Sequence, residues 1–207
     1  MNHRIVVVTI QLLLISTSLF AQSAAESFES ALIPKKGGAV VVYSGDSHSF
    51  TVDIISDDIK PLDHPGMVIV DNKTLQFVCI GYKVVKENGT AEEIQKTQLL
   101  TYMQYELDYV KNDVNMDYTD LHKYWVVIND KIFLLWYYNM PADNKSVLKQ
   151  INLSTLCFTH VLNLNTPFVN GDNFDDDKGL LLKVAQTLKQ NNFKISFDDL
   201  YKKLNPK

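Results

Sequence analysis

Apolar residues recur in strand-like patterns between residues 39 and 85. The segments AVVVYS (39–44), SFTVDII (49–55) and MVIVDNKTLQFVCIGYKVV (67–85) are rich in β-branched and aromatic residues, which favour strands. Inside the longest segment, Asp71, Asn72 and Lys73 supply the turn chemistry of a β-hairpin. This part of the chain is therefore predicted to form four strands.

A helical period begins at Thr90. In residues 90–114, TAEEIQKTQLLTYMQYELDYVKNDV, apolar residues recur at spacings of three and four, as on one face of an amphipathic helix. Thr90 and Glu93 have the spacing of a capping box, in which each side chain satisfies the other residue's backbone N–H. One long helix is therefore predicted to start directly after Thr90.

The segment KYWVVINDKIFLLWYYNMP (123–141) carries the pair Asn129-Asp130 between two apolar runs. If this pair is the turn of a hairpin, Tyr124, Val126, Ile128, Phe133, Leu135 and Tyr137 share one face, and Trp125, Val127, Ile132, Leu134, Trp136 and Tyr138 share the other. Both faces are apolar, which predicts a central hairpin that is covered on both sides. The alternative is an exposed aromatic platform of Trp125, Trp136 and Tyr138 that binds carbohydrate.

The C-terminal part of the chain predicts one more strand and two helices. STLCFTHVLNL (154–164) is strand-like, LLLKVAQTLKQNN (180–192) has one apolar helical face, and Ser196 with Asp199 marks the start of a short last helix. The expected fold is α+β: a mainly antiparallel sheet of six or seven strands with helices packed on it, in three α/β/α layers.

The N-terminus has the pattern of a secretory signal peptide. MNHR is followed by the apolar run IVVVTIQLLLI and by small residues, so residues 1–21 are predicted to be removed on export. Residues 22–38 are small and polar, which predicts a flexible leader, and residues 39–207 are predicted to form a single α+β domain. The product is expected to be a secreted or periplasmic protein with no integral membrane segment.

The hairpin is also where the chain resembles a known family. The run IFLLWYYNMPAD after the turn, and the order of strands, helix and hairpin, resemble the PsbP-like fold family, which includes exported bacterial proteins of unknown role. The resemblance covers residues 39–141 and implies a fold, but it implies no enzyme activity and carries over no catalytic residue.

The net charge and the two cysteines limit which functions the sequence favours. The net charge of −4 is spread along the chain, which disfavours nucleic-acid binding. Cys79 and Cys157 both fall in predicted strands, so they are predicted to be near neighbours on the sheet. Export allows a disulfide between them, and the alternative is two separately buried thiols.

Two short polar segments are candidates for chemistry. In PLDHPG (61–66), Asp63 is placed to orient His64 as an acid/base pair, although two flanking prolines are typical of a rigid turn that leaves His64 exposed. In NGDNFDDDKG (170–179), the carboxylates of Asp172, Asp175 and Asp177 are potential Ca²⁺ ligands. Phe174 stands where an oxygen donor is needed, so a solvated helix cap is the preferred interpretation.

These observations favour a non-enzymatic exported domain that binds a partner protein or a small ligand, with no cofactor. The first alternative is a hydrolase or lyase that uses Asp63 and His64. The second is a carbohydrate-binding module that uses Trp125 and Trp136.

Overall fold

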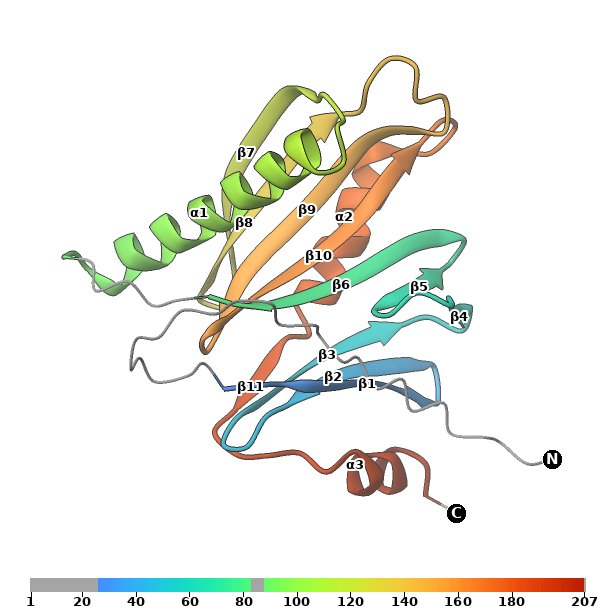
Figure 1. The fold of residues 1–207 in the computed structure, drawn as a ribbon. Coiled ribbons are helices and arrows are strands. Elements are labelled where there is room, and N and C mark those ends of the chain that lie inside the picture. Colours follow the sequence, from blue (N-terminus) through green and yellow to red (C-terminus); the bar gives the residue numbers. More distant parts are fainter. Residues whose placement is uncertain (1–25, 83–87, 207) are drawn as a thin grey trace.

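The computed structural model describes residues 26–82 and 88–206, so the predicted signal peptide, residues 1–21, lies outside the described residues. Two antiparallel sheets and three helices make up the described part of the chain (Figure 1). The strands are β1 Glu29–Lys35, β2 Gly38–Ser44, β3 Ser49–Ile55, β4 Ile59–Pro61, β5 Met67–Val70, β6 Lys73–Gly81, β7 Thr119–Ile128, β8 Lys131–Asn139, β9 Val147–Cys157, β10 His160–Val169 and β11 Lys189–Asn191. The helices are α1 Ala91–Asn112, α2 Phe174–Ala185 and α3 Phe197–Leu204.

The larger sheet has seven strands in the order β4-β5-β6-β10-β9-β8-β7, and the smaller one has four in the order β1-β2-β3-β11. Helix α1 packs on one face of the larger sheet, whereas α2 and the smaller sheet cover the other face (Figure 1). Helix α3 lies against β1. The predicted α+β class with helices on both faces of an antiparallel sheet is confirmed, but the second sheet was not predicted.

Part of that second sheet comes from the segment predicted as a flexible leader, and this prediction is wrong for residues 29–35. β1 pairs with β2 in a continuous antiparallel register from Glu29↔Ser44 to Lys35↔Gly38, and Ile33 is buried. The sequence pattern does not predict this strand, because polar residues and Pro34 interrupt its apolar positions. Proline is tolerated there because β1 is an edge strand of the smaller sheet.

The segment 154–164 is not one strand but parts of two. β9 ends at Cys157 and β10 starts at His160, with a tight turn at Phe158 and Thr159 between them. Phe158 adopts φ 56°, a backbone conformation that the sequence does not signal, because phenylalanine rarely adopts it. The last long helix also starts earlier than predicted, at Phe174, where the Asn173 side chain caps it.

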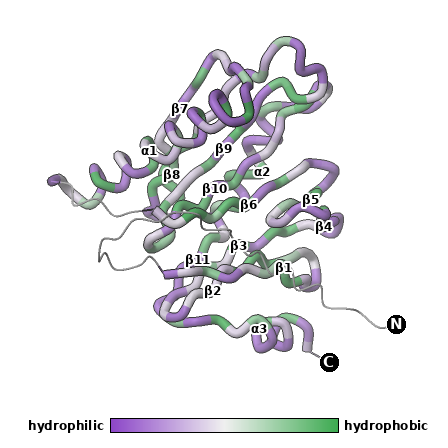
Figure 2. The backbone as a smooth tube through the Cα atoms, viewed as in Figure 1, coloured by the Kyte–Doolittle hydropathy of each residue, from purple (hydrophilic) through white to green (hydrophobic). Residues whose placement is uncertain are grey.

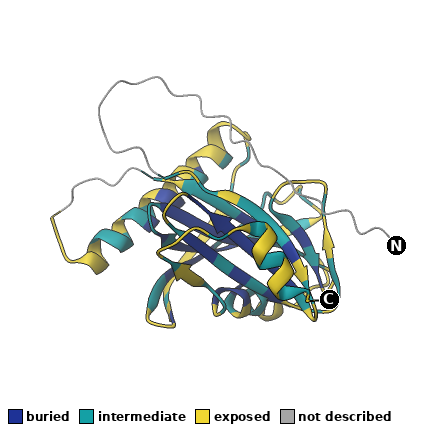
Figure 3. Cartoon of the chain, turned by 90° about the horizontal axis from the view of Figure 1, so that it is seen from below, coloured by how far each residue is buried: buried dark blue, intermediate teal, exposed yellow. Residues whose placement is uncertain are grey.

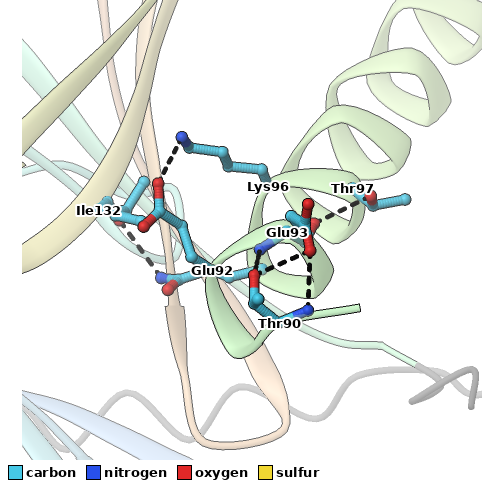
Figure 4. Close-up of polar contacts among 7 residues, drawn as sticks. Thr90, Glu92, Glu93, Lys96, Thr97 and Ile132 are labelled. Atoms are coloured by element: carbon cyan, nitrogen blue, oxygen red, sulfur yellow. Dashed lines mark hydrogen bonds and ion pairs between the residues drawn. The ribbon is translucent and has the colours of Figure 1, made fainter. Parts of the chain in front are cut away.

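The capping box of α1 is present as predicted (Figure 4). The Glu93 carboxylate accepts the Thr90 N–H at 2.8 Å, and the Thr90 hydroxyl accepts the Glu93 N–H at 3.2 Å. The Gln95 amide donates to the Ile132 carbonyl at 3.4 Å, which ties the start of the helix to β8.

Two apolar cores lie on opposite faces of the larger sheet. Under α1, Leu99, Met103 and Leu107 pack with Leu134 and Trp136 of β8. The larger core lies between the same sheet, α2 and the smaller sheet, and includes Phe50, Phe133, Leu153, Leu164 and Leu181. Figure 2 shows the mixed hydropathy of α1, and Figure 3 shows that buried residues concentrate in the strands while outward helix surfaces are exposed.

We predict that Trp136→Ala lowers the free energy of unfolding by about 3–5 kcal/mol, the usual loss for truncating a buried tryptophan. The Trp136 side chain is 2% exposed, and its Nε1 donates to the Ser154 hydroxyl at 3.1 Å. Urea unfolding followed by far-UV circular dichroism measures the change. The matched control is Trp125→Ala on the neighbouring strand, where the ring is 40% exposed and the expected loss is below about 1 kcal/mol. Equal losses in the two variants would contradict the buried position of Trp136.

Candidate functional site

The strand β7 forms one edge of the seven-stranded sheet (Figure 1). The two-residue turn and the side-chain faces predicted for the β7–β8 hairpin are confirmed by the register Val126↔Phe133 and Trp125↔Leu134. The prediction that the whole hairpin is central and covered is correct for β8 and wrong for β7. β8 is largely buried, but β7 is exposed along most of its length.

Apolar side chains of β7 are exposed beside polar ones such as His122 and Lys123. The apolar side chains at least one-third exposed are Leu121 at 38%, Tyr124 at 50%, Trp125 at 40% and Val127 at 67%. The Lys96 ammonium of α1 lies 5.5 Å from the centre of the Trp125 ring, which places this ring beside the helix. Native proteins usually protect such an edge with charges, prolines or a covering segment.

The backbone of β7 has hydrogen-bonding groups that face away from β8. Asn129 and Asp130 have φ 49° and 60°, as in a type I′ turn, so Ile128 and Lys131 form the hydrogen-bonded pair that closes the hairpin. Bonding alternates along an antiparallel pair. The N–H and C=O groups of Lys123, Trp125 and Val127 therefore point outward, and within the described part of the chain no strand pairs with that side.

On the opposite face of the hairpin, aromatic rings form a row that continues onto α2. The Tyr137 ring lies 4.9 Å from His122, 6.2 Å from Tyr124 and 4.9 Å from Phe174, measured between ring centres. The Lys149 ammonium lies 5.9 Å from the same ring. This row gives the edge an aromatic flank on the side away from α1.

The carbohydrate platform expected from Trp125, Trp136 and Tyr138 is not an exposed strip. Trp136 and Tyr138 are 2% and 4% exposed and lie in the core beneath α1. Trp125 is the member of the three that reaches the surface. Its ring sits on the edge strand, whereas the other two belong to a strand covered on both faces.

Asp63 and His64 lie on an exposed loop between β4 and β5. Backbone bonds hold the loop: the Met67 N–H donates to the His64 carbonyl at 3.2 Å, and the Leu62 N–H donates to the Met67 carbonyl at 3.1 Å. His64 is exposed, as predicted. Among the described residues, no side-chain hydrogen bond joins Asp63 to His64 or brings a third polar group to them.

Cys79 and Cys157 are free thiols on two strands that do not touch. β10 lies between β6 and β9, so the two strands are about 9.5 Å apart, beyond the ~7 Å limit for a disulfide, and the register also sets Cys79 and Cys157 two residues apart along the strands. The prediction that they are near neighbours is therefore wrong, although they share a face. Burial raises the pKa of the Cys157 thiol to about 12 and raises that of Cys79 as well, so both stay protonated at neutral pH.

The three aspartates considered as Ca²⁺ ligands have separate roles. Asp177 is fully buried and pairs with Lys73, which joins the β5–β6 hairpin to α2. Asp175 pairs with Lys178 at 2.6 Å on the exposed first turn of α2, and Asp172 precedes the Asn173 cap. Across residues 26–82 and 88–206, no group of three or more His, Cys, Asp or Glu side chains is arranged to hold a metal ion.

A second polar site was missed by reasoning from the sequence. Residues from three segments line a shallow hollow: Glu26, Asp46, Ser47, His48, Phe158 and Thr159. The Glu26 carboxylate contacts the His48 ring at 2.6 Å. Because these two residues lie 22 positions apart with no motif between them, the sequence carries no signal for the pair.

No protein-family model matches the chain, and no curated protein matches it. Among solved structures, the chain is similar to the solution structure of cyanobacterial PsbP (CyanoP) from Synechocystis sp. PCC 6803. The two are 11% identical, the match covers 84% of this chain and 97% of that chain, and the TM-score is 0.46. In the described part of the chain, no helix has the length and apolar character needed to cross a bilayer.

We predict that Lys73→Met lowers the free energy of unfolding by about 3–5 kcal/mol at pH 7, because it leaves the Asp177 carboxylate buried without a partner. Burial already raises the pKa of Asp177 in the folded protein, although Lys73 lowers it in part. A raised folded pKa means that stability falls as pH rises from the unfolded pKa of about 4 towards the folded pKa. The loss caused by Lys73→Met is therefore expected to be smaller at pH 5 than at pH 8.

Urea unfolding at both pH values measures these losses. The double variant Lys73→Met, Asp177→Leu is the control, because it removes both charges and should recover most of the lost stability. A loss that is the same at pH 5 and pH 8, or that the double variant does not reduce, would show that Asp177 is not held as a buried carboxylate.

Proposed function

We propose that this chain is a non-enzymatic binding domain that acts outside the cytoplasm and holds an extended segment of a partner protein at the β7 edge. The observation that carries the proposal is a ten-residue edge strand whose apolar side chains are exposed and whose outer side pairs with no strand in the described part of the chain. Addition of a strand to such an edge is a common mode of peptide recognition, in which backbone bonds give affinity and side-chain contacts give specificity.

The backbone groups and side chains of β7 indicate which conformation and which residue types the partner segment should have. Lys123, Trp125 and Val127 offer backbone donors and acceptors, so the segment has to be extended and free of proline where it pairs. Exposed apolar side chains on β7 favour β-branched or aromatic residues opposite them, because cross-strand pairs of this kind stabilise a sheet. The exposed ammonium of Lys123 favours an acidic residue opposite it.

Action outside the cytoplasm is supported by the signal-peptide pattern of residues 1–21. No observation on the described residues favours the hydrolase hypothesis, because Asp63 and His64 lie on an open loop without a converging third group. The carbohydrate-binding hypothesis requires an exposed Trp136, but this residue is buried. Strand addition at β7 is therefore the function that the geometry supports best.

We predict that peptides selected from a displayed random library will bind the wild-type chain through β7, and that Val127→Pro will weaken their binding at least tenfold. The outward N–H of Val127 is lost in this variant, but the pairing of β7 with β8 does not use that group, so the hairpin is retained. Fluorescence anisotropy with labelled peptides measures the affinities.

The control variant is Tyr105→Ala, which removes an aromatic ring that is 62% exposed on α1 and leaves the strand edge intact. Its affinity for the selected peptides should match that of the wild type. Peptides that bind Val127→Pro as tightly as the wild type, with circular dichroism unchanged, would show that the β7 edge is not the binding site.

A further inference from the structure

The turn between β2 and β3 directs two backbone N–H groups at one carboxylate oxygen. Residues 45–48 connect the last pair of these strands, Ser44↔Ser49, and the Gly45 N–H donates to the His48 carbonyl at 2.9 Å. This closure leaves the N–H groups of Ser47 and His48 directed at one point outside the turn, where both meet the same oxygen. Successive backbone N–H groups in a turn are a common cradle for anions.

The carboxylate of Glu26 occupies that point. Its Oε1 accepts the Ser47 N–H at 2.5 Å and the His48 N–H at 3.0 Å, and its Oε2 lies 2.6 Å from Nδ1 of the His48 ring. One carboxylate therefore meets three nitrogen atoms, two from the backbone and one from an imidazole. Charge-assisted bonds of this kind are stronger than neutral ones.

Gly45 makes room for the carboxylate. A Cβ atom at this position would lie 2.5 Å from Oε1 of Glu26, closer than a Cβ atom approaches a non-bonded oxygen. The atom it would meet is the end of a flexible side chain, so a larger residue at position 45 would displace the carboxylate rather than disrupt the turn. The space beside Gly45 therefore fits the Glu26 carboxylate, and a substitution of Gly45 by a larger residue would fill that space.

The surroundings of the site combine an apolar wall with a few charges. The Phe158 ring lies tilted against the His48 ring with centres 4.3 Å apart and lines the hollow together with Thr159. The other titratable groups near the site in the described residues include Asp46, which pairs with Lys194 at 3.7 Å, and His160, whose pKa is lowered by burial and raised in part by Glu26. Burial raises the pKa of the Glu26 carboxyl, but the bonds from Ser47 and His48 outweigh it, so the net pKa is lowered.

A purely structural role for Glu26 would be to anchor the entry to β1. Phe28 already does this by packing against Phe50 and His160, with ring centres 5.3 Å and 4.8 Å apart. The carboxylate site, in contrast, borders on solvent, since the His48 side chain is 37% exposed and that of Glu26 is 17% exposed. An external molecule therefore reaches the His48 ring directly, and it reaches the two backbone N–H groups when Glu26 leaves them.

We propose that the β2–β3 turn is a carboxylate-binding site, that Glu26 occupies it as an intramolecular ligand, and that a carboxylate on another molecule competes with Glu26 for it. The ligand class is a carboxylate on a flexible chain with a small apolar group that lies against Phe158. A protein C-terminus and an acidic side chain share this chemistry. The site is separate from the β7 edge and does not depend on its function.

The test is a titration of the full chain with sodium acetate, followed by NMR of the Ser47 and His48 amide groups, against sodium chloride at equal ionic strength. In the Glu26→Ala variant the site is vacant, and acetate is expected to shift both amide signals in a saturable way. In the wild type the tethered Glu26 competes at a high effective concentration, so the apparent affinity for acetate is expected to be lower by about tenfold or more.

Two further variants make the outcome decisive. Glu26→Ala combined with Gly45→Ala should lose the saturable shift, because the added Cβ would lie 2.5 Å from the position of the carboxylate oxygen and so overlap a bound carboxylate. Glu26→Gln keeps the side-chain volume but removes the charge, so acetate should displace the amide and bind more tightly than in the wild type. The proposal is overturned if Glu26→Ala shows no saturable shift while its remaining amide signals match those of the wild type. Equal acetate affinity in Glu26→Ala and the wild type overturns it as well.

The two sources of a carboxylate are distinguished with short peptides added to the Glu26→Ala variant. One peptide ends in Val with a free C-terminus, and the other carries an internal Glu and an amidated C-terminus. Tighter binding of the first peptide assigns the site to a chain terminus, and tighter binding of the second assigns it to an acidic side chain. If neither peptide shifts the Ser47 and His48 signals at concentrations where acetate does, the idea that the site accepts a carboxylate on a flexible chain is wrong.

Discussion

The central strands of the larger sheet are apolar on both faces, and this constraint determines how the remaining elements are arranged. In β8, Leu134 and Trp136 face one side while Phe133 and Leu135 face the other, and all four are buried. A sheet of this kind needs a cover on each face. Helix α1 supplies one cover, and α2 with the four-stranded sheet supplies the other. The protein is therefore layered because its middle strands cannot be exposed to water on either side.

The elements that cover the two faces of the larger sheet do not extend over its edge strand, which explains why β7 is exposed. Its partner β8 is enclosed, but beyond it the Lys96 side chain of α1 lies over Trp125, and the described residues supply no strand on the outer side. At the far side of the sheet, the Lys73–Asp177 pair holds α2 against the β5–β6 hairpin. The same architecture thus produces a well-enclosed centre and an open edge at β7.

The two proposed surfaces differ in their physical basis. The β7 edge offers backbone bonds and apolar contacts, so it suits an extended segment of a chain. The β2–β3 turn offers two backbone donors and an imidazole, so it suits a single carboxylate. One depends on a strand that lacks a neighbour, and the other depends on three segments meeting in space: residue 26, the β2–β3 turn and the β9–β10 turn.

Local signals in the sequence determined the capping box at Thr90, the Asp71-Asn72 and Asn129-Asp130 turns, the faces of the β7–β8 hairpin and the start of α3 at Ser196, because each depends on residues within a few positions of one another. Only the tertiary structure decided that residues 29–35 form a strand, that β7 is an edge and that β10 separates Cys79 from Cys157. It also brought Glu26 to His48. These outcomes depend on strand order and on which element covers which face. Periodicity does not encode that order, because a strand has the same alternation at the centre of a sheet and at its edge.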